Sequence, residues 1–228
     1  MTNPTPRKSA LIMPSLLSAP FDHLGKAIRE LEYAGAALFH YDVMDGHFVP
    51  NLSGSPQIIK DLQPIIRSRF DVHLMASNPE RMIPWFDLAS VRSMSIHVEA
   101  SQNIPADLQN IRSRGKGAGL VVNPPTPMDS LDPFWEQIDQ VLVMTVVPGL
   151  GGQTLIQEAL PKIERCAAKR DALGLDFAIQ VDGGVNEDTL RCVFDAGAGE
   201  IVSGSAIFRQ PDPAAAYQRL NRLIGNSV

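Results

Sequence analysis

The chain has 228 residues, of which 44% are hydrophobic, and its 20 basic and 25 acidic side chains give a formal net charge of −5. This length suits one compact domain with a sizeable core. No run of basic residues suggests a nucleic-acid or anionic membrane surface, so no nucleic acid and no membrane is expected as a partner. A small molecule is favoured instead.

The N-terminal residues and the cysteines indicate the cellular compartment of the protein. The segment MTNPTPRKSA lacks the apolar core of a signal peptide, and no stretch approaches the roughly 20 apolar residues of a membrane helix. Cys166 and Cys192 lack the paired spacing of a zinc knot or redox motif. We therefore expect a cytoplasmic protein, with a flexible N-terminus at 1–10 and a single domain at 11–228.

Short apolar runs recur at a steady interval, and amphipathic stretches with helical spacing lie between them. Strands and helices are therefore predicted to alternate. The predicted strands are 11–13, 37–43, 70–74, 94–98, 118–122, 141–146, 177–181 and 201–203. The helical patterns include 24–33, 104–114, 157–173, 187–196 and 213–224.

Eight such units predict a (β/α)₈ TIM barrel, because parallel strands joined by right-handed crossovers close naturally at that number. An open doubly wound sheet is the structural alternative. That fold usually carries a glycine-rich phosphate loop after its first strand, yet the turn here, PSLLSAPF (14–21), has no glycine. The glycines cluster late, at 148–152, 182–184 and 203–205, which favours the barrel.

Polar residues at the ends of the predicted strands are candidates for a site, because the carboxyl ends of barrel strands meet at one mouth. His40 and Asp42 lie two apart on the second strand and therefore point the same way. His73 ends the third strand and Asp182 ends the seventh. Together they offer two nitrogen and two oxygen ligands, a set suited to a divalent cation.

The pattern of His40 and Asp42 recurs in His97 and Glu99, at the end of the fourth predicted strand. A lone histidine at a strand end is more often a hydrogen-bonded core residue than a metal ligand. The spacing of the residues therefore leaves open which histidines belong to the metal site.

The late glycines predict an anion site. Loops after the seventh and eighth strands of such barrels often bind phosphate, because bare backbone N–H groups attract an anion. Gly183 and Gly184 follow the seventh strand, and Gly204 and Ser205 follow the eighth. An ordinary tight turn is the alternative for each glycine taken singly. The glycines at 149–152 predict a flexible flap over the mouth.

Three methionines lie at strand ends beside candidate site residues: Met44, Met75 and Met144. Flexible, polarizable side chains suit the wall of a pocket that holds a delocalised anion. Ordinary packing at the barrel rim is the alternative for each one. We expect the three to form a pocket wall.

Nearly the whole chain, from Met13 to about Tyr217, resembles the ribulose-phosphate 3-epimerase family. Several long motifs in the right order make the resemblance specific. These motifs are PSLLSA (14–19), HYDVMDGHFVPN (40–51), DVHLM (71–75), HVEA (97–100), GLVVNPPTP (119–127), VMTVVPGLGGQ (143–153), VDGGV (181–185) and SGSAIF (203–208).

The resemblance implies a metal-dependent enzyme that binds one divalent ion, Zn²⁺ or Fe²⁺, with Mn²⁺ or Co²⁺ also suitable. Its implied ligands are His40, Asp42, His73 and Asp182, which leaves His97 outside the metal site. Asp42 and Asp182 are also the implied catalytic acid/base residues, on opposite faces of the substrate. The implied substrate-binding residues are Ser15, His73, Gly149, Leu150, Gly151, Gly152, Asp182, Gly183, Gly184, Gly204 and Ser205.

The reaction implied by the resemblance interconverts D-ribulose 5-phosphate and D-xylulose 5-phosphate, a step of the pentose phosphate pathway. Inverting a carbon beside a ketone removes a proton from one face and returns one on the other, so two carboxylates must flank that carbon. A cation stabilises the enediolate formed between the two transfers. Barrels of this kind often associate, so a homo-oligomer is expected.

Departures from the family pattern bear on the substrate. Val147 stands where relatives often have Glu or Asn, and Leu150 where Phe is usual. Gln180 replaces a frequent Glu, and Gly54–Ser55 replaces a hydrophobic residue and Gly. These positions favour, as the alternative, a sister 3-epimerase for a six-carbon ketose phosphate such as allulose 6-phosphate.

Two further alternatives come from other classes. A catalytically inactive sugar-phosphate-binding barrel would normally have lost a ligand or one aspartate, and all four candidates are present. A phosphate-sugar lyase or decarboxylase uses a lysine among its carboxylates, and no predicted strand ends in one.

Overall fold

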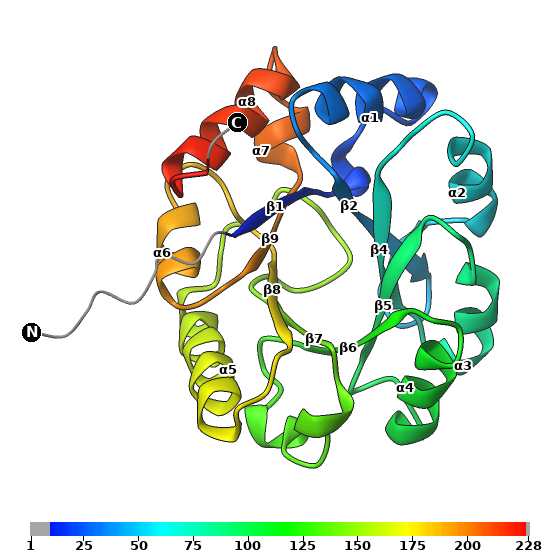
Figure 1. Cartoon of the computed structure of the whole chain (residues 1–228), viewed down its shortest axis with the longest axis vertical. Coiled ribbons are helices and arrows are strands. Elements are labelled where there is room, and N and C mark those ends of the chain that lie inside the picture. Colours follow the sequence, from blue (N-terminus) through cyan, green and yellow to red (C-terminus); the bar gives the residue numbers. More distant parts are fainter. Residues whose placement is uncertain (1–9, 227–228) are drawn as a thin grey trace, which may run out of the picture.

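Parallel strands form a barrel at the centre of the molecule, and helices surround it (Figure 1). The structure, a computed structural model, describes residues 10–226. Of the predicted flexible segment, 1–9 lie outside the described residues, and Ala10 is buried. The strands of the barrel are β1 (Leu11–Pro14), β2 (Leu38–Asp45), β4 (Arg69–Met75), β5 (Val91–His97), β6 (Gly117–Val122), β7 (Gln140–Met144), β8 (Ala178–Asp182) and β9 (Glu200–Ser203).

The sheet closes on itself. Its order is β1-β9-β8-β7-β6-β5-β4-β2, with parallel pairing throughout, and a parallel bridge between Ser15 and His40 joins the two ends. A short strand, β3 (Leu52–Ser53), pairs antiparallel with the end of β2 and lies outside the ring. The predicted (β/α)₈ barrel is thus confirmed, while β3 was not predicted.

Helices follow most strands, and within residues 10–226 none is long and apolar enough to cross a membrane. The α-helices are α1 (Leu24–Tyr33), α2 (Pro56–Leu62), α3 (Pro79–Met82), α4 (Ile104–Arg112), α5 (Leu160–Leu173), α6 (Leu190–Asp195), α7 (Ser205–Phe208) and α8 (Pro213–Leu223). The 3₁₀ helices are η1 (Leu16–Ser18), η2 (Phe21–His23), η3 (Ile83–Phe86), η4 (Met128–Leu131), η5 (Trp135–Gln137) and η6 (Gln157–Ala159). The crossover after β6 contains only η4 and η5, so this unit departs from the predicted repeat.

Local sequence signals set several helix boundaries. The side chain of Asp212 accepts a hydrogen bond from the backbone N–H of Ala215 at 2.9 Å, and Pro213 occupies the first turn of α8. Asn103 caps α4 in the same way. At the other end of a helix, Gly174 terminates α5 with φ of 63°, a left-handed conformation that favours glycine.

The alternation of side chains along β2 explains how one strand serves both the core and the site. Phe39, Tyr41 and Val43 belong to the large apolar core cluster of the protein. The residues between them, His40 and Asp42, point to the opposite face of the strand, inside the barrel. A single strand therefore anchors the helical layer and places two polar groups at the mouth.

Candidate metal centre and active site

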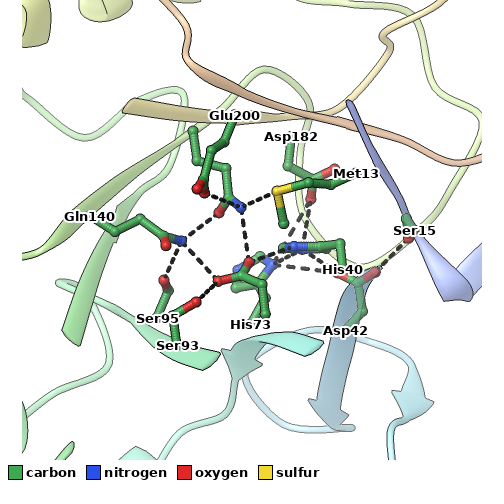
Figure 2. Close-up of polar contacts among 12 residues, drawn as sticks. Met13, Ser15, His40, Asp42, His73, Ser93, Ser95, Gln140, Asp182 and Glu200 are labelled. Atoms are coloured by element: carbon green, nitrogen blue, oxygen red, sulfur yellow. Dashed lines mark hydrogen bonds and ion pairs between the residues drawn. The ribbon is translucent and has the colours of Figure 1, made fainter. Parts of the chain in front are cut away.

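Four predicted ligands from three strands converge at the carboxyl end of the barrel (Figure 2). One donor atom from each lies within 4.8 Å of the others. The parallel register of β2 and β4 places Asp42 directly beside His73, and β8 supplies its last residue. The four residues are His40, Asp42, His73 and Asp182.

The spacing of the four ligand atoms suits a single divalent cation. His40 Nε2 lies 3.4 Å from Asp42 Oδ1 and 3.4 Å from His73 Nδ1, and the last two atoms are also 3.4 Å apart. Asp182 Oδ2 lies 3.8 Å from His40 Nε2 and 3.9 Å from His73 Nδ1. Two ligands that each lie about 2.1 Å from one cation are roughly 3 to 4 Å from one another. The donor set can therefore hold a divalent cation.

Asp71 holds one of these ligands from inside the barrel. Its Oδ2 accepts hydrogen bonds from His40 Nδ1 at 2.9 Å and from Gln180 Nε2 at 2.9 Å, while Oδ1 accepts one from Ser93 at 2.5 Å. Sequence reasoning missed this carboxylate. The available signal was its place two residues before His73 on one strand, which directs both side chains inward.

His97 lies beside the metal centre but outside the set of donors. Its Nε2 is 2.8 Å from His73 Nε2, and its Nδ1 is 3.2 Å from Glu99 Oε2. The contact is therefore made on the side of the His73 ring that faces away from the four donor atoms. The structure thus separates the two histidines that the sequence pattern left equivalent.

The two aspartates have pKa values shifted in opposite directions. Burial disfavours the charged form of Asp42, but His40 and His73 outweigh burial and lower its pKa well below the usual range. For Asp182, burial together with the negative charges of Asp42 and Asp71 raises the pKa to about 7. Without a metal ion, Asp42 is therefore ionised near neutral pH while Asp182 is only partly ionised.

The two imidazoles also differ. Burial by itself lowers the pKa of His40, yet Asp42, Asp71 and Asp182 raise it well above its ordinary value of 6.5. Burial is the main reason that the pKa of His73 falls to about 4. The negative charge of the site is thus concentrated around His40, where a cation is also favoured.

A cavity of about 260 Å³ lies against this group. All but one of the predicted substrate-binding residues border it, as do the three methionines. The exception is His73, which is fully buried and does not reach the cavity surface. The predicted residues that line the cavity are Ser15, Asp42, Met44, Met75, Met144, Gly149, Leu150, Gly151, Gly152, Asp182, Gly183, Gly184, Gly204 and Ser205.

The backbone of the glycine loops passes where side chains cannot fit. Gly183 and Gly184 have φ of 123° and 68°, and a Cβ on Gly184 would lie 2.3 Å from the backbone nitrogen of Leu155. Ser18 and Asn186 also line the cavity and were not predicted. Ser18 lies within the PSLLSA motif, which was the available signal.

Two amide side chains hold the flap at 147–153. Asn51 Nδ2 donates to the carbonyl oxygen of Gly149 at 2.8 Å, and Gln153 Nε2 donates to those of Val147 and Leu150 at 2.7 and 2.8 Å. The flap is therefore held through its backbone, while the side chains of Val147 and Leu150 stay largely exposed.

Comparisons with known proteins identify the family and the fold of the chain. The chain is 42% identical to a ribulose-phosphate 3-epimerase from Bacillus subtilis, over 92% of this chain and 97% of the relative, and 44% identical to one from Synechocystis sp., over 92% of each. A solved structure of KGPDC from Streptococcus mutans has the same fold, with a TM-score of 0.69 at 13% identity, over 94% of this chain and 97% of that one. The model of the Ribulose-phosphate 3 epimerase family matches residues 11–208. The chain therefore belongs to the ribulose-phosphate 3-epimerase family.

Proposed function

We propose that this protein is a metal-dependent epimerase that interconverts D-ribulose 5-phosphate and D-xylulose 5-phosphate. Membership of the family and the names of the relatives from two bacteria support the reaction. The observation that carries the proposal is the pair of carboxylates, Asp42 and Asp182, which border one cavity from β2 and β8.

The two aspartates suit proton transfer on opposite faces of C3. Asp42, with its lowered pKa, is ionised and takes the proton from one face. Asp182, which borders the same cavity from β8, delivers a proton to the other face. In the reverse direction the two residues exchange roles. The enediolate exists only between the two transfers.

The four converging side chains would hold the ion. A bound divalent cation supplies positive charge that stabilises the negative charge on the substrate oxygens. The hydroxyl of Ser15 donates to Asp42 Oδ2 at 2.8 Å, which leaves Oδ1 directed at His40 and His73. Two imidazoles and two carboxylates suit Zn²⁺ or Fe²⁺, with Mn²⁺ or Co²⁺ as alternatives.

The backbone of the late loops would bind the phosphate. Gly183, Gly184, Gly204 and Ser205 all border the cavity, and bare N–H groups are suited to an anion. An anchored phosphate holds the reacting carbon between the two carboxylates, which replaces a chance encounter with a fixed geometry. The flap at 147–153 limits the access of water to the proton-transfer site.

The proposal extends to the setting of the enzyme. Two free cysteines, one of them buried, are compatible with the reducing cytoplasm, where we place the protein in the pentose phosphate pathway. The exposed apolar side chains Phe21, Leu52 and Trp85 line one open groove, and a contiguous apolar surface of this kind favours association into a homo-oligomer.

A six-carbon ketose phosphate is the second candidate substrate. Leu150 borders the cavity at the position where Phe is usual in the family, and the smaller side chain leaves more room there. A lyase or decarboxylase is disfavoured because no lysine lines the cavity within the described residues. An inactive binding barrel is disfavoured because all four candidate metal ligands of this chain are present and converge.

The test is hydrogen exchange at C3. Protein loaded with Zn²⁺ or Fe²⁺ is incubated with D-ribulose 5-phosphate in deuterated water and followed by ¹H NMR. We expect D-xylulose 5-phosphate with deuterium at C3, and loss of the reaction on strong chelation until metal is returned. Absence of exchange in metal-replete protein would exclude this substrate. A higher kcat/KM for allulose 6-phosphate would favour the six-carbon alternative.

A further inference from the structure

A line of hydrogen bonds runs outward from the metal centre through groups that the reaction does not use. His73 Nε2 lies 2.8 Å from His97 Nε2, and His97 Nδ1 lies 3.2 Å from Glu99 Oε2. The other carboxylate oxygen, Oε1, accepts from the backbone N–H of Asn123 at 3.0 Å and from the hydroxyl of Thr126. Both imidazoles are fully buried, so water cannot replace these partners.

The donors and acceptors along this line determine where each hydrogen lies. A carboxylate only accepts, so His97 Nδ1 carries the hydrogen that is shared with Glu99. A neutral imidazole has one N–H, and His97 Nε2 is therefore an acceptor. The hydrogen between the two rings must then belong to His73 Nε2. His73 Nδ1, which faces Asp42 Oδ1 at 3.4 Å, is left with its lone pair.

The surroundings keep the line in this arrangement. The rings of His73 and His97 stack, with centroids 5.0 Å apart, and the ring of Phe48 packs against His97 with centroids 4.6 Å apart. Lys162 of α5 donates to the backbone carbonyl of Asn123 at 2.8 Å, and so ties down the loop that binds the carboxylate. These contacts restrain both rings.

Glu99 is fixed as an ionised acceptor at the outer end of the line. Burial disfavours its charge, but the hydrogen bonds from His97, Thr126 and Asn123 outweigh burial and lower its pKa to about 2. An acceptor that keeps its charge across the neutral range imposes the same direction on the hydrogen bonds behind it.

We propose that Glu99, acting through His97, is a positioning residue that keeps the Nδ1 lone pair of His73 directed into the metal site. This inference rests on the proposed function only in requiring that the site binds a metal. It gives a role to the pair of residues that the sequence pattern could not separate from His40 and Asp42.

The decisive variant is Glu99→Gln, which keeps the shape of the side chain. Its amide oxygen must serve the donors from Asn123 and Thr126, so its NH₂ group faces His97 Nδ1. The direction of every hydrogen bond along the line is then reversed. His73 carries its hydrogen on Nδ1, where the metal would bind. The matched control is Thr126→Val, which loosens the loop but leaves the carboxylate opposite His97.

Two readouts test the proposal without any sugar. Competition with a chelator gives the Zn²⁺ affinity, and two-bond ¹H–¹⁵N correlations of metal-free protein give the tautomer of His73. We expect Nε2–H in the wild type, Nδ1–H in Glu99→Gln, and a loss of Zn²⁺ affinity of about 10- to 100-fold in that variant. Thr126→Val should keep the wild-type tautomer and nearly its affinity.

Several results would overturn the proposal. The first is a Zn²⁺ affinity of Glu99→Gln equal to that of the wild type. The second is an equal loss of Zn²⁺ affinity in Thr126→Val without a change in the tautomer of His73. The third is a hydrogen on Nδ1 of His73 in the wild type. The tautomer of His73 in the wild type tests the proposal even if Glu99→Gln does not fold. Absence of Zn²⁺ binding by the wild type would overturn the metal site itself. A failure of epimerase activity alone, with Zn²⁺ binding intact, would refute the proposed reaction and leave this inference standing.

Discussion

Asp71 Oδ2 lies 2.9 Å from His40 Nδ1, with both side chains fully buried inside the barrel. Because a carboxylate only accepts, Nδ1 carries a hydrogen, and in the neutral form of His40 that binds a metal Nε2 is left with its lone pair directed at Asp42 and Asp182. The carboxylate of Asp71 therefore orients a ligand that it does not itself join, as hydrogen-bonded carboxylates commonly do behind metal-bound histidines.

The first prediction concerns this contact. Asp71→Asn should lower Zn²⁺ affinity about 10- to 100-fold, because an amide can present its NH₂ group to His40 and no longer fixes the ring hydrogen. Chelator competition measures the affinity. Ser93→Ala is the control, since it removes one donor to Asp71 but keeps the carboxylate beside His40. Equal affinities in Asp71→Asn and the wild type would contradict the role.

The second prediction concerns the two acid/base residues. Asp42→Asn and Asp182→Asn should each lower kcat about 10²- to 10⁴-fold or more, because an amide cannot transfer the proton at C3. A coupled assay for D-xylulose 5-phosphate measures the loss. A variant with one remaining carboxylate can still exchange a C3 proton on a single face, so exchange without epimerisation is the distinguishing signature. Wild-type turnover in either variant would refute its role as a base.

The third prediction is a pH dependence of the stabilisation by metal. In the metal-free protein the pKa of Asp182 is about 7, above its ordinary value of 3.8, so the stability that this group contributes is complete below about pH 4 and is lost as the pH rises through 7. Metal binding requires the ionised form. The rise in Tm on adding Zn²⁺ should therefore grow between about pH 5.5 and pH 8.

The control for this pH dependence is Asp182→Asn, which cannot ionise at that position. Differential scanning fluorimetry with and without Zn²⁺ should show a flatter dependence on pH in this variant. A rise in Tm that is constant across the range in the wild type would show that the proton on Asp182 is not linked to metal binding.

The fourth prediction compares two glycines with similar backbone angles. Gly184 and Gly174 have φ of 68° and 63°, but an added Cβ meets the backbone of Leu155 at 2.3 Å in the first case and nothing within 4 Å in the second. Gly174→Ala should cost only the strain of a left-handed residue, about 1 kcal/mol. Gly184→Ala should cost more and should also raise KM, because the proposed phosphate loop must shift.

Urea unfolding and steady-state kinetics separate the two effects. Gly174→Ala should leave KM unchanged, since Gly174 ends α5 and does not border the cavity. An unchanged KM in Gly184→Ala would remove the loop after β8 from the phosphate site.

The sequence by itself determined the strands and the polar residues that end them. All eight predicted strands form, with shifts at their ends such as the start of β5 at Val91 rather than 94. The α1 helix occupies the predicted residues, Leu24–Tyr33. These features depend on side-chain direction and burial within a few residues, so a repeat of two or about 3.6 residues records them directly.

Only the tertiary structure decided which of these groups meet. The sequence presents His40 with Asp42 and His97 with Glu99 as equal pairs, but the closure of β1 against β2 and the register of β2 with β4 bring only the first pair into the set of donors. Asp71 likewise acquires its role only when His40 arrives beside it on the neighbouring strand. The distance between two side chains on different barrel strands depends on strand order, register and closure together. The local pattern of one strand determines none of these.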